Sequence, residues 1–319
     1  VYTAMTAPSP DGRITLACPG LYAPEHEAAW KRLTDFVHAE TTAKICCQIG
    51  HAGRKASVQL PWQDDEAPLK EDGWKTLSSS VLPWSSAHPA PRQMTLEDMD
   101  RVTEDFAKAT EMAKRAGFDM VELHAAHGYL ISSFISPMSN NRTDEFGGSL
   151  GNRMRFPLRV MKAMRAAWGE EKPLSVRISA SDWVGDKGVT PEEAVEIAKM
   201  FSDAGADIID VSAGQTSTDA QPIYGRMFQT PFSDRIRNEA GLATMAVGNI
   251  TEADQVNGIL LAGRADLVCL ARPHLADPYW TLHAAIAAGD TGTDWPLPYD
   301  AGRKQAERLR EKQQEVLRA

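Results

Sequence analysis

Short apolar runs alternate with amphipathic stretches along most of the chain, and this alternation predicts a series of strand–helix units. The apolar runs predict strands at residues 1–7, 43–50, 119–124, 173–179, 206–212, 242–248 and 265–271. The amphipathic stretches predict helices at residues 23–40, 95–116, 150–168, 190–204, 231–240, 251–262 and 276–288. Continuously apolar strands that alternate with helices are typical of a parallel sheet covered by helices, so the predicted fold class is α/β.

The order of these units favours a barrel over an open doubly wound sheet. A doubly wound sheet that binds a dinucleotide carries a glycine-rich turn after its first strand, and the chain contains no G-x-G-x-x-G motif. We therefore predict a (β/α)8 TIM barrel.

The number of predicted strands is one short of the eight that a closed barrel needs. The first predicted strand begins at residue 1, so we expect a TIM barrel that lacks its first strand in this chain. The alternative is an unrecognised strand between residues 51 and 94. That segment contains five prolines and many serines, which are typical of a long loop or lid.

The length of 319 residues suits a single barrel domain, which we expect over residues 1–290. Residues 291–319 form the expected second segment, a charged C-terminal tail whose pattern from residue 303 onward is helical. A solvated helix and a helix that contacts another subunit both fit this pattern.

Composition argues against several classes of function. Lys and Arg number 34 against 43 Asp and Glu, and the resulting net charge of −9 argues against a nucleic-acid partner. No apolar run reaches the roughly 18 residues of a transmembrane helix, and the first residues do not resemble a signal peptide. The four cysteines include no C-x-x-C pair, which argues against a disulfide scaffold or a cysteine metal centre. We therefore expect a cytoplasmic protein with no membrane partner.

The densest group of chemically active side chains follows the predicted strand 119–124. His124, His127 and Tyr129 lie just past its carboxyl end, where barrel active sites are found. Two imidazole N–H groups could bind and polarise one carbonyl or anionic oxygen, and the phenol could donate a proton. A metal site without an evident third ligand is one alternative, and a pair of structural histidines is another.

Other polar residues occupy strand positions or strand ends that a barrel would bring together. Arg177 lies within an apolar strand, where an inward guanidinium needs an anion or acceptor, although an outward orientation is the alternative. Gln48 ends the strand 43–50 and could pair with an amide-like heterocycle, or serve as a structural amide. Gly248 and Arg272 follow the last two strands, where barrels commonly bind phosphate. Together these residues favour a phosphorylated heterocyclic cofactor with a carbonyl substrate stacked on it.

Over nearly its whole length, from about residue 9 to about residue 290, the chain resembles the Old Yellow Enzyme family of FMN-dependent ene-reductases. The motifs that carry the resemblance are HAGRK at 51–55, H-x-x-H-G-Y-L at 124–130, SPMSNNRTDEFGGSLGNRMRF at 136–156, Arg177, VGNI at 247–250 and GRADLVCLARPHLADP at 263–278. Within the family, the chain is similar to the reductase-like portion of bifunctional salicylyl-CoA 5-hydroxylases and to bacterial NADPH dehydrogenases. Dienoyl-CoA reductase relatives carry a cysteine cluster after the barrel, whereas residues 290–319 contain no cysteine.

The resemblance implies a role for each candidate residue. His124 and His127 would bind the substrate carbonyl oxygen, and Tyr129 would donate a proton. Arg177 would lie near flavin N1 and O2, and Gln48 near the pyrimidine edge. The full set of residues implied to contact FMN is Met5, Gln48, Arg177, Gly248, Asn249, Ala271 and Arg272, of which the last four would hold the phosphate. No metal is implied.

The implied reaction begins with reduction of FMN by NADPH or NADH. Hydride then passes from flavin N5 to the β-carbon of an α,β-unsaturated carbonyl compound or CoA thioester. Family members are often oligomers, so the expected protein partners are a second copy of the chain or an upstream fused monooxygenase domain.

Two features depart from the family pattern. The chain lacks the Ser/Ala-Pro-Met-Cys/Thr-type stretch of the family's first strand, and Met5 stands where the family usually has a small residue. A second hypothesis is therefore a non-catalytic truncated or fused barrel module that no longer binds flavin. A third is a metal-assisted hydrolase or lyase that uses His124 and His127.

Overall fold

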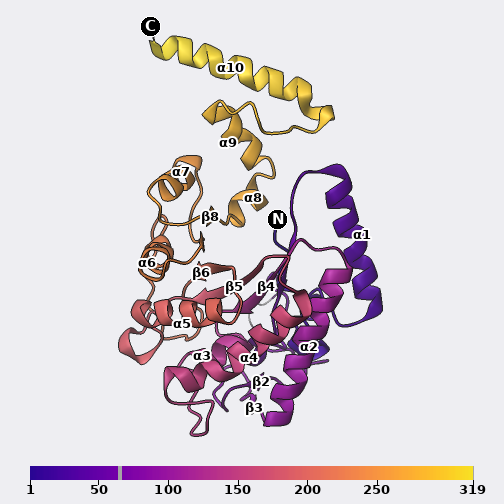
Figure 1. Ribbon diagram of the computed structural model, residues 1–319, viewed down its shortest axis with the longest axis vertical. Helices are drawn as coiled ribbons and strands as arrows, with labels where there is room; N and C mark the ends of the chain where they lie inside the picture. Colours follow the sequence, from indigo (N-terminus) through magenta and orange to yellow (C-terminus); the bar gives the residue numbers. More distant parts are fainter. Residues whose placement is uncertain (64–66, 319) are drawn as a thin grey trace.

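The computed structural model describes residues 1–63 and 67–318, and its centre is a six-stranded parallel sheet (Figure 1). The strands lie in the order β1 (Cys46–Ile49), β4 (Met120–Ala125), β5 (Leu174–Ser179), β6 (Ile208–Ser212), β7 (Thr244–Ala246) and β8 (Leu267–Val268). Every neighbouring pair is parallel, and the spatial order follows the chain order throughout. A doubly wound sheet would reverse its order at a switch point, so this arrangement confirms the predicted barrel topology.

Residues 1–7 extend the sheet beside β1 without forming a continuous strand. Tyr2 and Thr6 form isolated parallel bridges with Cys46 and Ile49. The seven predicted strands therefore correspond to six strands and this bridged segment. Among the described residues, no backbone hydrogen bond joins the segment to β8, so the sheet is open between them.

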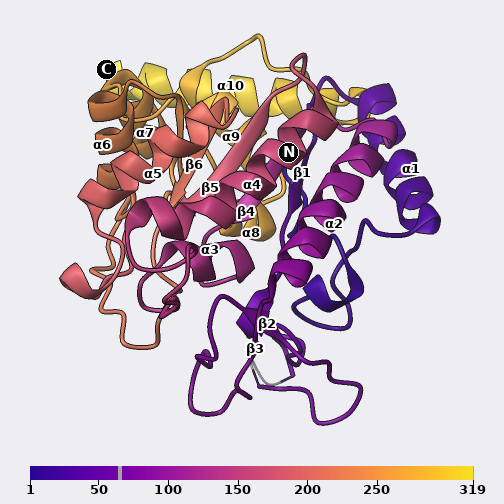
Figure 2. The same ribbon diagram turned by 60° about the horizontal axis from the view of Figure 1, so that its bottom comes forward.

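Helices pack around the outer face of the sheet (Figure 2). The long ones that alternate with the strands are α1 (Pro24–Glu40), α2 (Leu96–Arg115), α4 (Leu150–Trp168), α5 (Pro191–Asp203), α6 (Thr230–Ala240) and α7 (Ala253–Leu261). The sequence pattern predicted all six. At the start of α2, for example, Thr95 and Asp98 form a capping box in which each side chain accepts a hydrogen bond from the other residue's backbone N–H.

The predicted helix at 276–288 was wrong at its start. The structure has two helices here, α8 (Arg272–Ala276) and α9 (Trp280–Ala288), separated by residues 277–279. Asp277 precedes Pro278, which forces it into an extended conformation with φ −134° and ψ 95°. A further helix, α3 (Leu130–Ile135), was not predicted because its six residues are all buried and show no amphipathic period.

The segment between residues 51 and 94 is mainly a long loop, as the sequence indicates, and its described part contributes no strand to the barrel. It contains the 3-10 helix η2 (Gly53–Lys55) and two short strands, β2 (Leu77–Ser78) and β3 (Arg92–Gln93), which pair only with each other. The remaining 3-10 helices are η1 (Pro10–Gly12), η3 (Gly185–Lys187) and η4 (Leu297–Tyr299).

The chain ends in α10 (Asp300–Arg318), which matches the helical tail predicted from residue 303. This helix packs on α9 and η4 and lies at the opposite end of the molecule from β2 and β3 in both ribbon views (Figures 1 and 2). None of the helices in the described parts of the chain is long and apolar enough to cross a membrane.

The two faces of the strands differ in polarity, and this difference positions the candidate site. Outward side chains such as Cys47, Val121 and Val176 belong to the hydrophobic core between the sheet and the helices. The intervening inward positions carry polar side chains, among them Gln48, Glu122, Ser175, Arg177 and Asp210. The barrel interior is therefore a polar layer enclosed by an apolar one.

Arg165 near the end of α4 is expected to be important for stability because it satisfies several backbone carbonyls at once. Its guanidinium donates to Gly205 O, Gly169 O and Lys172 O and pairs with Asp207. Arg165→Met would leave these carbonyls without their donor in a nearly buried position. We expect it to lower the free energy of unfolding by about 2–4 kcal/mol, measured by urea denaturation.

Arg155→Met on the same helix is the matched control. Arg155 pairs with Glu145, and both side chains are more than half exposed, so the change should cost less than about 0.5 kcal/mol. Equal losses for the two variants would contradict the assigned role of Arg165.

Candidate functional site

A cavity of about 830 Å³ lies at the carboxyl ends of β5 to β8. The predicted site residues in its lining are His127, Arg177, Gly248, Asn249, Ala271 and Arg272. Its volume is typical of cofactor and small-molecule sites, and its place in the barrel is the usual one for catalysis. The other predicted residues, Met5, Gln48, His124 and Tyr129, lie outside this lining.

His124, His127 and Tyr129 form one cluster beside the cavity. The ring centroids of His124 and His127 are 5.1 Å apart, and those of His124 and Tyr129 are 4.9 Å apart. Nδ1 of His124 accepts a hydrogen bond from the Ala126 N–H at 3.3 Å, and Nε2 of His127 lies 2.7 Å from the Ser212 hydroxyl. The structure thus brings together the three residues that the sequence places in a catalytic role.

Both imidazoles are neutral at pH 7. Burial, with a smaller contribution from the positive charge of Arg177, lowers the pKa of His124 to about 3. Burial also lowers the pKa of His127, and the nearby His124 ring and the positive charge of Arg177 add to this effect. The rings can therefore serve as hydrogen-bonding groups without carrying a charge.

The turn after β4, which carries this cluster, contains two residues with a left-handed backbone conformation. His127 and Gly128 have φ values of +63° and +72°. A Cβ at position 128 would lie 2.7 Å from the Gln215 carbonyl oxygen, so only glycine fits there. This turn carries the chain from His124 to His127 and Tyr129 within one compact loop.

Arg177 points into the barrel, as the sequence predicts for an arginine in an apolar strand. One Nη lies 3.2 Å from a carboxylate oxygen of Asp210, its register partner on β6. Nε of Arg177 and the other carboxylate oxygen of Asp210 are buried without a hydrogen-bond partner. Burial lowers the pKa of Arg177, but the carboxylates of Asp210 and Glu122 outweigh this effect and raise it, so the guanidinium stays charged.

Glu122 is a second buried carboxyl group in the same interior. Gln48 Nε2 donates to one of its oxygens at 2.8 Å, and the Ser175 hydroxyl donates to the other at 2.7 Å. Burial raises the pKa of Glu122 to about 8, and the nearby Asp210 adds to the shift. Because Asp210 has the closer contact with Arg177, the proton resides on Glu122 at neutral pH. Gln48 is thus a partner of Glu122 in this structure.

Met5 lies against the turn after β1. A Cβ at Gly50 would meet the Met5 side chain at 2.8 Å and Cβ of His124 at 2.9 Å. The segment 1–7 therefore places Met5 close to the histidine cluster.

The loops after β7 and β8 form the end of the cavity where the sequence predicts phosphate binding. Gly248 and Asn249 have φ values of +112° and +50°, and the Asn249 amide donates to the Gly225 carbonyl. Ala271 caps α8, and Arg272 is its first residue. Arg272 is exposed and lines the cavity.

Sequence reasoning missed the aromatic wall of the cavity. Trp84, Trp183, Tyr224 and Phe228 line it, and the rings of Trp183 and Phe228 stack with centroids 6.4 Å apart. These residues come from loops with no periodic pattern. The signal that could have indicated them is the occurrence of large aromatic side chains in loops that follow predicted strand ends.

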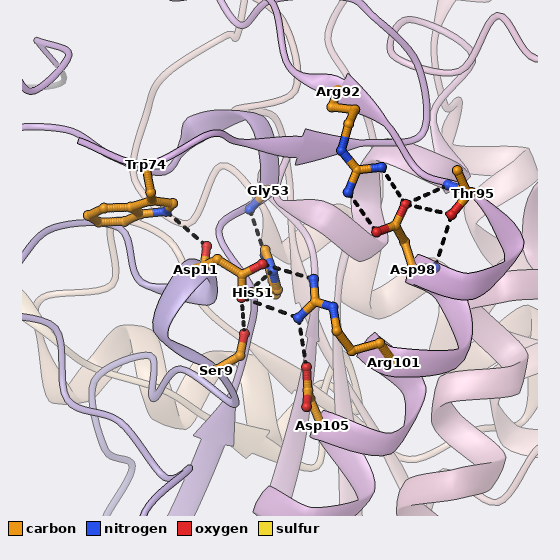
Figure 3. A network of polar contacts seen from close by, with 10 residues as sticks. All are labelled: Ser9, Asp11, His51, Gly53, Trp74, Arg92, Thr95, Asp98, Arg101 and Asp105. Carbon is orange, nitrogen blue, oxygen red and sulfur yellow. Dashed lines mark hydrogen bonds and ion pairs between the residues drawn. The ribbon is translucent and has the colours of Figure 1, made fainter.

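The histidine of the HAGRK motif is part of a polar network that fixes η2 (Figure 3). His51 is buried, and its Nδ1 accepts from the Gly53 N–H, while its Nε2 lies 3.9 Å from Asp11. Asp11 also pairs with Arg101 on α2, and its carbonyl accepts from the Trp74 indole. The network connects η1, η2, α2 and the long loop, so His51 has a structural role here.

Among residues 1–63 and 67–318, no three His, Cys, Asp or Glu side chains are placed to hold a metal ion together. His124 and His127 thus have no third ligand in the described structure.

Comparison with known proteins gives one family match and several similar relatives. Residues 1–288 match the model of the NADH:flavin oxidoreductase / NADH oxidase family. The chain is 42% identical over 286 residues to an NADPH dehydrogenase of Geobacillus sp. (strain WCH70), an alignment that covers 90% of this chain and 78% of the relative.

Two solved structures extend the comparison. A 2-naphthoyl-CoA reductase in complex with 2-naphthoyl-CoA has a TM-score of 0.79 at 27% identity, covering 91% of this chain and 44% of that one. A morphinone reductase in complex with tetrahydroNAD has a TM-score of 0.73 at 26% identity, covering 92% of this chain and 78% of that one.

The raised pKa of Glu122 predicts how stability depends on pH. Between about pH 4.5 and pH 8 the folded chain holds this proton and the unfolded chain has lost it, so the free energy of unfolding falls as the pH rises. The slope is at most about 1.4 kcal/mol per pH unit. Glu122→Gln keeps an acceptor oxygen for Gln48, and its amide N–H can donate to the Ser175 hydroxyl oxygen in place of the bond that Ser175 donates. It should flatten this decline, measured by urea denaturation from pH 5 to 8.5.

Glu171→Gln is the control, because Glu171 is exposed and the change removes a carboxylate of the same kind. The free energy of unfolding of this variant should keep the pH dependence that the parent protein shows. A decline that is the same in Glu122→Gln as in the parent would show that Glu122 does not hold the proton.

Proposed function

The chain belongs to the NADH:flavin oxidoreductase / NADH oxidase family, as its resemblance to the Old Yellow Enzyme family predicted, and from this premise we propose its substrate class. It is an NAD(P)H-dependent flavin oxidoreductase with FMN as its cofactor. We propose that it passes hydride from NAD(P)H through FMN to an alkene conjugated with a carbonyl or thioester group. The observation that carries the proposal is the neutral His124–His127–Tyr129 cluster beside a cavity lined by Arg177.

The residues of the cavity fit FMN. Nε of Arg177 is buried without a partner, and a cationic donor at this position suits the side of the flavin where negative charge develops on reduction. At the other end of the cavity, Gly248, Asn249, Ala271 and Arg272 would hold the phosphate. FMN, when bound, supplies a centre that accepts hydride from the nicotinamide and delivers it to the second substrate.

The protein's own part in the reaction is to bind and polarise the substrate oxygen and to supply a proton. In the neutral ring of His124, Nδ1 accepts from the Ala126 N–H, so Nε2 carries hydrogen and can donate to a carbonyl oxygen. Tyr129 lies against this ring and is the proposed proton donor to the α-carbon.

The aromatic side chains that line the cavity favour a planar, conjugated substrate. Trp84, Trp183, Tyr224 and Phe228 offer flat apolar surfaces beside the polar end of the cavity. The likeness to a reductase that binds 2-naphthoyl-CoA favours including CoA thioesters among the substrates to test.

The proposal is tested by flavin retention and turnover. The purified chain is incubated with excess FMN and desalted, and its visible spectrum is recorded. We expect near-stoichiometric flavin, and NADPH or NADH oxidation that depends on added 2-cyclohexen-1-one or crotonyl-CoA. Absence of retained flavin would favour the non-catalytic barrel module, and flavin without alkene-dependent oxidation would exclude the proposed substrate class.

His124→Ala tests the assigned oxygen-binding role. Loss of one hydrogen-bond donor to the developing negative charge should lower kcat/KM for the enone by about 100- to 1,000-fold, with flavin retained. His283→Ala is the control, because His283 is largely exposed in α9 and should leave both properties unchanged. Unchanged turnover in His124→Ala would overturn the role.

A further inference from the structure

A second cavity, of about 790 Å³, lies next to the main one where the segments after β5 and β6 meet. Its lining includes Ser181, Val184 and Lys187 from the segment after β5, and Asp219 and Gln221 from the segment after β6. Among the described residues, Trp183 alone lines both cavities. Its side chain is therefore part of the wall between the two spaces.

The backbone at Trp183 has an unusual conformation for a large side chain. Its φ of +58° lies in the left-handed region, which favours glycine and is strained for a bulky residue. Two hydrogen bonds hold it there: the Trp183 N–H donates to the Ser181 hydroxyl at 3.1 Å, and the Trp183 carbonyl accepts from the Gln221 N–H at 2.9 Å. Strain that the surrounding structure maintains in this way is common at ligand sites.

The indole ring of Trp183 is held in place by packing. It stacks with Phe228 at a centroid distance of 6.4 Å and meets Phe232 edge-on at 5.3 Å. A Cβ at Gly214 would lie 3.0 Å from Cδ1 of the indole, so the ring rests close to the Gly214 backbone. The indole N–H is buried and has no hydrogen-bond partner among the described residues, so shape and not hydrogen bonding fixes the ring.

We propose that Trp183 determines the size of the substrate by closing the main cavity against the second one. With the indole in place, a ring system that enters the main cavity from the polar end stops at this wall. Without it, two spaces of about 830 and 790 Å³ would join. The inference rests on the proposed function for the identity of the ligand and adds a size limit to its substrate class.

The chemistry of the second cavity indicates what a longer ligand would carry at its far end. The Ser181 hydroxyl, the Gln221 amide and the Lys187 ammonium belong to residues of its lining and can form hydrogen bonds. A rigid enone with a hydroxyl group at its far end would therefore use both cavities once the wall is removed. Testosterone has this form, whereas 2-cyclohexen-1-one is small enough for the main cavity alone.

The test compares the Kd values of these two enones for the FMN-loaded parent and for Trp183→Ala. Binding is measured by isothermal titration calorimetry without NADPH or NADH, so no turnover is involved. Relative to 2-cyclohexen-1-one, Trp183→Ala should bind testosterone about 10- to 200-fold better than the parent does, because the wall that excludes the additional rings is gone. An unchanged ratio of the two Kd values would overturn the proposal.

Trp183→Gly gives a second reading if Trp183→Ala does not fold. Glycine adopts the left-handed backbone without strain and also removes the indole, so the ratio of Kd values should shift in the same direction. A folded Trp183→Gly variant with the ratio of the parent would equally overturn the proposal.

Trp62→Ala is the matched control, because Trp62 is 78% exposed and lines neither cavity. It removes an indole of the same size and should keep the ratio of the parent. A shift in Trp62→Ala as large as that in Trp183→Ala would show that the wall is not its cause.

The proposed function fails or stands separately from this size limit. If the ratio shifts in Trp183→Ala but neither enone supports oxidation of NADPH or NADH, the size limit stands and the proposed hydride transfer fails. If alkene-dependent oxidation occurs and the ratio does not shift, the proposed function stands and Trp183 does not set the size of the substrate.

Discussion

The burial of Arg177 with two carboxyl groups inside the barrel is the constraint on which the site depends. One guanidinium cannot neutralise both Asp210 and Glu122 in an interior with little water, so one carboxyl group keeps its proton. The same positive charge lowers the pKa of His124 and His127 beyond the effect of burial. Neutral histidines, a protonated glutamic acid and a charged arginine thus follow from one arrangement of side chains on β4, β5 and β6.

The sequence predicts the scaffold of this site well because the scaffold is encoded locally. Apolar runs and amphipathic periods identify the strands and the long helices, and the apolar surroundings of Arg177 already favour an inward side chain with an anionic or acceptor partner. The partner itself could not be identified, because Asp210 is brought opposite Arg177 only by the register of two parallel strands. Gln48 illustrates the same limit, since its contact with Glu122 also depends on register.

Sulfur-containing and aromatic side chains line the part of the interior near the open side of the sheet. The Tyr2 hydroxyl donates to the sulfur atoms of Met245 at 3.2 Å and Met120 at 3.6 Å, and the Cys269 thiol contacts Met245. Burial raises the pKa of both Tyr2 and Cys269, so both stay neutral. These neutral groups therefore add no further charge to an interior that already holds Arg177.

Two serines outside the loop, Ser179 and Ser212, stabilise the left-handed backbone conformation of His127. Ser179 and Ser212 are the last residues of β5 and β6 and are register partners, so they lie side by side at the carboxyl ends of the two strands. Ser179 accepts from the His127 backbone N–H and donates to the Gly214 carbonyl, while Ser212 contacts the ring. Backbone and side chain of one residue are thus held by adjacent strands, which offsets a strained φ that would otherwise cost on the order of 1–3 kcal/mol. A strand register that places Asp210 against Arg177 therefore also places the serines against His127, and a single pairing of β5 with β6 orders both halves of the site.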